Sequence, residues 1–138
     1  MSRFFLFSPL FAQPVPTMKP SAKLVYLLCA AYGPMLVALH YLTWLIGRLV
    51  LGHWPRPSID DPMSISGVWV PHYLTTGFTL LLPAVALVPI GMVVVAMQQR
   101  EPGTVRNIGA AVAVLAMLAA CVVFLRLDPH QVAVWHAD

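Results

Sequence analysis

The chain has 138 residues, of which 59% are hydrophobic and only 9% are charged, and its formal net charge is +3. Soluble domains carry about 25% charged residues, so the composition excludes a water-soluble globular protein and predicts an outer surface that faces lipid. The few Lys and Arg residues lie at the ends of apolar runs, as a membrane boundary requires. We therefore expect the lipid bilayer as a partner and no nucleic acid.

Residues 1–23 form a tail ahead of the first long apolar run. Its segment 4–11 is apolar, as in a signal peptide, but Pro9 interrupts it. Met18, followed closely by two lysines, resembles an ordinary start for a membrane protein. We interpret residues 1–17 as an upstream start assigned in error or a loose tail, with a cleaved signal as the alternative.

Three long apolar runs follow, at 24–51, 73–97 and 108–127. Each reaches the ~20 residues that a helix needs to cross ~30 Å of hydrocarbon. Helices are expected because every backbone group must find its partner inside the lipid. The sequence therefore predicts an all-α membrane protein: a three-transmembrane-helix bundle, with 98–107 as a turn between the second and third spans.

Positive charges favour one orientation of this bundle. Five Lys or Arg residues flank the side that holds the amino terminus, and three flank the other side. By the positive-inside rule the amino terminus is cytoplasmic and the carboxyl terminus periplasmic, in a multi-pass protein of a bacterial inner membrane. All four tryptophans map to the outer boundary, as an aromatic belt would: Trp44, Trp54, Trp69 and Trp135.

Two segments on the outer side carry the same start signal for a short helix. In the loop 52–72, Asp61 precedes Pro62, and in the carboxyl-terminal segment 128–138, Asp128 precedes Pro129. An Asp as N-cap followed by Pro is typical of a helix start. We predict an ordered outer loop and short interfacial helices on this side, with Asp61 and Asp128 as caps.

Small residues mark the faces that we expect to pack against other helices, because lipid tails give apolar side chains no drive to associate. The first span offers Gly33 and Gly47 on one face. The third offers a stripe of small residues at helical spacing: Gly109, Ala113, Ala116 and Ala120.

His40 lies within the first span, about ten residues or ~15 Å of helix from its outer end. An ionisable group at that depth is a candidate for function. One interpretation is a structural histidine that donates to a neighbouring helix, and the other is a cofactor ligand. A haem needs an axial histidine, but a bis-histidine site needs a second one at similar depth, and His72 lies only at the edge of the second span.

The outer side holds four further histidines that could ligate a metal: His53, His72, His130 and His136. Histidine is a ligand type for zinc and other transition metals. No two of them are three or four residues apart, however, and His130 and His136 would lie on different faces of one helix. Polar residues at a wet boundary are the favoured interpretation.

No motif indicates catalysis, because no nucleophile turn and no phosphate-binding glycine loop is present. We therefore predict a non-catalytic, small integral inner-membrane protein that acts as an accessory or scaffold subunit of a membrane complex, through contacts with other subunits or by self-association. No cofactor is expected in that case. The alternative is a redox component that binds haem or a metal at His40 or at the outer histidines.

Overall fold

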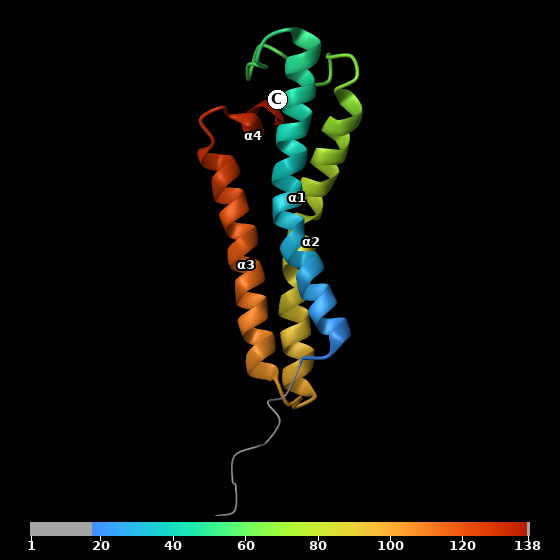
Figure 1. The fold of residues 1–138 in the computed structure, drawn as a ribbon, viewed down its shortest axis with the longest axis vertical. Coiled ribbons are helices and arrows are strands. Elements are labelled where there is room, and N and C mark those ends of the chain that lie inside the picture. Colours follow the sequence, from blue (N-terminus) through green and yellow to red (C-terminus); the bar gives the residue numbers. More distant parts are fainter. Residues whose placement is uncertain (1–17, 138) are drawn as a thin grey trace, which may run out of the picture.

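The computed structural model of the chain describes residues 18–137, which form a bundle of three long helices with a short fourth helix at one end (Figure 1). The helices are α1 (Pro20–Leu51), α2 (Trp69–Gln98), α3 (Thr104–Leu127) and α4 (Val132–Trp135). Each of the first three is long and apolar enough to cross a membrane. The prediction of an all-α, three-helix membrane bundle is confirmed, and its outer surface is suited to lipid.

Each long helix begins four residues before its apolar run, at Pro20, Trp69 and Thr104 instead of 24, 73 and 108. The extra turns contain polar residues that hydropathy alone leaves out. Pro20 suits this position because a helix leaves its first N–H groups without internal partners. The helices thus extend beyond their apolar runs at their amino-terminal ends.

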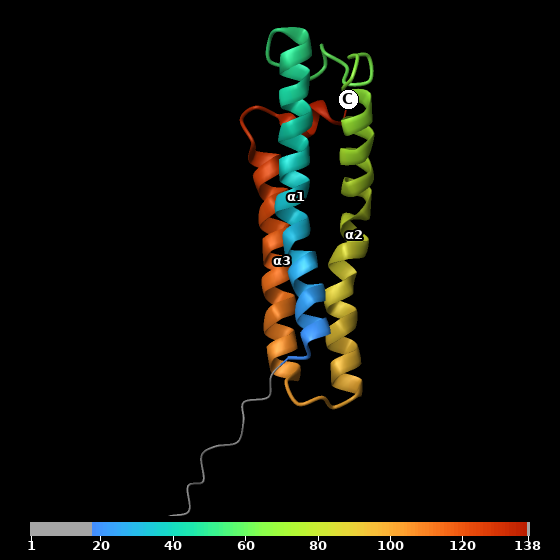
Figure 2. The same cartoon turned by 45° about the vertical axis from the view of Figure 1, so that its right-hand side comes forward.

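The three long helices differ in length. With 32 residues α1 is about 48 Å long and with 30 residues α2 is about 45 Å, whereas α3, with 24 residues, is about 36 Å. The first two exceed a hydrocarbon core of ~30 Å by a wide margin. Figures 1 and 2 show the consequence: α1 rises above the end of α3, and α4 folds back into the space that α3 leaves.

At the end of the bundle where α1 begins, α1 and α3 supply the buried core. It consists of Tyr26, Cys29, Ala111, Val114 and Leu118. An ion pair between Lys19, just before α1, and Glu101, in the turn between α2 and α3, joins two segments of this end. Lys19 and the turn after α2 therefore lie on the same side of the bundle, as the orientation argument required.

The opposite end carries a folded unit, here named the outer cap, made of the loop 52–68 and the segment 128–137. Its core combines Trp44 of α1 with four residues from the two segments: Ile65, Val68, Val132 and Trp135. The Trp135 indole N–H donates to the backbone oxygen of Asp60 and so ties the two segments together. The short helix α4 rests on the bundle through this core.

The two expected caps behave differently. The Asp128 carboxylate accepts hydrogen bonds from the backbone N–H of His130 (3.3 Å) and of Val132 (3.1 Å), the first residue of α4. Asp61 accepts from the backbone N–H of Met63 (2.8 Å), but the residues after it form turns and bends, not a helix. Gly67, with φ of +81°, lies just before α2, so the segment is too short to nucleate a helix of its own.

The tryptophans do not form one lipid-facing belt. Trp44 and Trp135 are buried, and Trp135 has no exposed surface at all, whereas Trp54 and Trp69 are about half exposed. Trp54 stacks on Trp44 with ring centroids 4.4 Å apart. The belt interpretation was wrong for the two buried rings because the outer cap needs large apolar side chains for its core.

Candidate functional site

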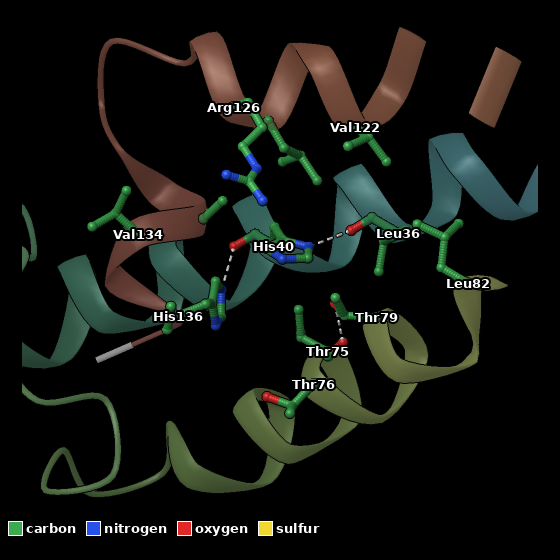
Figure 3. A pocket seen from close by; sticks show the side chains of 13 residues that line it. Leu36, His40, Thr75, Thr76, Thr79, Leu82, Val122, Arg126, Val134 and His136 are labelled. Carbon is green, nitrogen blue, oxygen red and sulfur yellow. Dashed lines mark hydrogen bonds between the residues drawn. The ribbon is translucent and has the colours of Figure 1, made fainter. Parts of the chain in front are cut away.

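Three histidines from distant parts of the sequence meet beneath the outer cap. His40 comes from α1 and His136 from the residues just after α4 (Figure 3). His72 comes from α2. The ring centroid of His136 lies 4.8 Å from that of His40 and 5.5 Å from that of His72. Of the four outer histidines, His72 and His136 therefore lie side by side.

The hydrogen bonds of this cluster fix the orientation of the His136 ring. Its Nε2 lies 3.2 Å from the backbone oxygen of His40, which can only accept, so Nε2 carries the proton. In the neutral ring Nδ1 is then the acceptor, and the His72 Nδ1–H donates to it across 3.3 Å. Both nitrogens of His136 are thereby occupied.

The pKa of His136 is lowered to about 4, mainly by burial and also by the neighbouring His40 and His72, while its bond to the His40 oxygen acts in the opposite direction. Asp128, a carboxylate of the same outer cap, behaves differently. Burial alone would raise the pKa of Asp128, but hydrogen bonds from Val132, Tyr41 and His130 outweigh it and the net pKa is lowered. The cap therefore combines a neutral His136 with a charged Asp128.

We predict that acid loosens the docking of the carboxyl-terminal segment. Because the pKa of His136 is lower in the folded protein than in the unfolded chain, its contribution is complete above about pH 6.5 and is lost as the pH falls toward 4. Up to about 3 kcal/mol is involved. Thermal unfolding in detergent at pH 7 and pH 4.5 should show the loss, and His136→Gln should flatten this part of the profile. An equally steep profile in His136→Gln would contradict the assignment.

A cavity of about 620 Å³ lies beside this cluster, between the outer halves of the three long helices and the end of the chain. Figure 3 shows His40 near its centre, with Arg126 above it and the threonines of α2 below. Apolar side chains make up much of the wall, among them Leu36, Leu82 and Val122. Its size falls within the range of roughly 300–1,000 Å³ that is usual for small-molecule sites.

His40 is the most informative side chain of this wall. Only 4% of it is exposed. Its Nδ1–H donates to the backbone oxygen of Leu36, one turn earlier in α1, across 2.9 Å. In the neutral ring the lone pair is then on Nε2, which has no hydrogen-bond partner among residues 18–137.

The other outer histidines lie away from the cavity. His53 is exposed in the loop, where its Nδ1 lies 3.0 Å from the backbone oxygen of Trp54. His130 is exposed as well, with its ring 5.3 Å from that of Trp44. Among the described residues, no three His, Cys, Asp or Glu side chains are arranged to hold a metal ion. The four candidate metal ligands thus split into one pair, His72 and His136, and two separate surface residues.

The small residues fall into two groups. A Cβ on Gly33 would lie 2.9 Å from the Cys121 sulfur, and one on Gly47 would lie 2.9 Å from Cγ of Pro55, so both positions sit at close approaches. The stripe of α3 faces outward: Gly109, Ala113, Ala116 and Ala120 are all exposed. α3 turns Ala111, Val114 and Leu118 toward the bundle, so the stripe packs against no helix of the described chain.

Arg126 and the threonines of α2 are members of the site that sequence reasoning did not select. Arg126 is one of the three basic residues counted on the outer side, and Thr75, Thr76 and Thr79 lie near the outer end of the second span. The available signal was Arg126 itself, because a charged residue in the last turn of a span can point into the bundle. No protein-family model, curated protein or solved structure matches the chain.

Proposed function

We propose that the protein is a non-catalytic accessory subunit of a membrane complex in a bacterial inner membrane, and that it binds its partner through the outer cap. The observation that carries this proposal is an ordered surface with large apolar side chains turned outward. Ile59 is 66% exposed and Met63 is 49% exposed, although the loop around them is held by the cap core. Exposed apolar groups on an ordered surface favour a protein contact.

The order of the loop supports a contact surface because an ordered surface loses little entropy on binding. Asp60 accepts from the backbone N–H of Arg56 (2.8 Å), and Asp61 accepts from that of Met63. Ile59 and Met63 are therefore held by turns on either side of these two carboxylates. The partner that fits is an apolar patch on the periplasmic part of another membrane protein.

The outward stripe of α3 supports a second, lateral contact inside the bilayer. Small residues let helix backbones approach closely, and this is a main source of helix association in lipid. Ala113 and Ala116 are exposed near the middle of α3. A helix of the same partner, or of a second copy of this chain, would pack there.

The expected orientation places the outer cap in the periplasm. Its support is the charge distribution, with Lys19, Arg100 and Arg106 at the opposite end of the bundle. A cysteine introduced as Ser66→Cys, at an exposed position of the loop, should react with a membrane-impermeant maleimide added to spheroplasts. Labelling only after lysis would reverse the orientation.

Native mass spectrometry of the tagged protein, extracted from its own membrane in mild detergent, tests the accessory function. We expect a complex whose added mass matches a partner subunit. The double substitution Ile59→Ser and Met63→Ser should release that partner and leave thermal stability within about 0.5 kcal/mol, because both side chains are exposed. Ser66→Asn, in the same loop, is the matched control and should retain it. A monomer without added protein mass in wild-type membranes would contradict the proposal.

A further inference from the structure

The cavity under the outer cap combines three features, and a ligand for this cavity has to match all of them. They are an imidazole lone pair with no hydrogen-bond partner among the described residues, a cation at the outer rim, and apolar walls supplied by three helices (Figure 3). A ligand in this cavity does not depend on the partner contact proposed above.

The first feature is the tautomer of His40. Metal-ligating histidines almost always donate their other ring N–H to a carbonyl or carboxylate, which orients the ring and makes the ligating nitrogen more basic. The bond from Nδ1–H of His40 to the Leu36 oxygen is of this type. The bond leaves the Nε2 lone pair of His40 free, and His40 lines the cavity.

A bare metal ion does not fit this site. It needs several protein ligands, yet the described residues contain no suitable group of three. His136 lines the same cavity, but both of its nitrogens are already engaged, with His72 and with the His40 oxygen. A haem iron carries four ring nitrogens of its own, so a single histidine is enough to hold it.

The second feature is Arg126 in the last turn of α3. Its guanidinium is directed from α3 toward His40, and it forms no ion pair within the part of the chain that the structure describes (Figure 3). Arginine binds carboxylates through two parallel N–H···O bonds. The propionates of a haem are carboxylates, and the outer rim is where they would reach both Arg126 and water.

The third feature is the apolar part of the wall, which lies deeper in the bundle at Leu36, Leu82 and Val122. A flat apolar macrocycle matches it, with the propionates at the rim. The two cysteines of the chain, Cys29 and Cys121, do not line the cavity, so no thioether bond to the ligand is available.

We propose that this cavity binds one haem b non-covalently, with Nε2 of His40 as the single protein ligand to the iron and Arg126 as the partner of a propionate. The ligand would insert beneath the outer cap, with its polar edge outward. One protein ligand leaves the iron five-coordinate.

Titration of the full-length protein with hemin in mild detergent tests the proposal. We expect a Soret band that saturates at one haem per chain. His40→Ala should weaken binding at least about tenfold, because loss of the ligand costs no less than loss of its outer-shell support. His40→Gly should regain the band when imidazole is added, a rescue that a merely structural histidine would not show. Arg126→Gln should weaken binding about tenfold with an unchanged band shape.

His130→Ala, at an exposed position outside the cavity, is the control and should bind as the wild type does. If the His40 variants fail to fold, Arg126→Gln decides alone, because Arg126 is exposed at a helix end. A folded wild-type protein without saturable binding, or equal affinity in Arg126→Gln and wild type, would overturn the proposal. A partner in native mass spectrometry without bound haem would leave the accessory function standing and exclude the haem.

Discussion

Trp135→Ala should lower the free energy of unfolding by about 3–5 kcal/mol, as expected for loss of a fully buried tryptophan. Trp135 has no exposed surface, packs with Ile65 and Val68, and donates its indole N–H to the Asp60 oxygen. Its removal leaves a hole between the loop and the carboxyl-terminal segment. Thermal unfolding in detergent measures the loss. In a protein with a carboxyl-terminal tag, a protease should remove the tag together with the released segment 128–138 faster than in the wild type.

Trp69→Ala provides the matched control, because Trp69 lies at the same end of the bundle but is 53% exposed. Its unfolding temperature should stay close to that of the wild type. Trp135→Phe separates packing from hydrogen bonding: it keeps a ring in the core but removes the donor to the half-buried Asp60 oxygen, at a cost of about 1 kcal/mol. Equal stability of Trp135→Ala and wild type would show that the outer cap does not stabilise the bundle.

Gly47→Ala should be destabilising by about 1–3 kcal/mol, although alanine is the better helix former. A Cβ at this position would lie 2.9 Å from Cγ of Pro55 and 3.1 Å from Cη2 of Trp135. Both atoms belong to rigid rings, so α1 and the outer cap have to move apart. The same unfolding assay measures the effect, and Gly47→Val should enlarge it.

Gly77→Ala is the control for this substitution, because a Cβ on Gly77 of α2 would meet nothing within 4 Å. It should be neutral or slightly stabilising, by about 0.5–1 kcal/mol. The double variant Gly47→Ala with Trp135→Phe, which lacks the Cη2 atom, should lose less stability than the sum of the two single variants. Strict additivity would place the steric conflict at Pro55 alone.

The three-helix fold was predictable from hydropathy because a helix in lipid must be apolar along most of its length. The rotation of each helix about its own axis was not predictable. The stripe at Ala113 and Ala116 looked like the packing face of α3, yet the bundle uses Ala111 and Leu118. In a helix that is apolar on every side, the side chains of neighbouring helices choose the buried face, and a single sequence does not reveal them.

The histidine cluster was beyond reach of the sequence for a related reason. His40 was selected from its depth in the first span, but its neighbour His136 arrives through a reversal of the chain after α3. Gln131, in a left-handed conformation with φ of +52°, helps to turn α4 back over the bundle. The hydropathy pattern shows that the third span is the shortest, but it does not show that the chain after it folds back into the space that this leaves.

The composition of the outer cap core sets an order of events in biogenesis. Ile65 and Val68 are synthesised before the second span, whereas Val132 and Trp135 are synthesised after the third. The loop is therefore synthesised before its packing partners in the carboxyl-terminal segment. The core of the outer cap can form completely only after all three spans have been inserted. Until then Ile65 and Val68 have only the α1 side of this core, at Trp44, to pack against. The folded outer surface is therefore completed by the last segment and not by the insertion of α1 and α2.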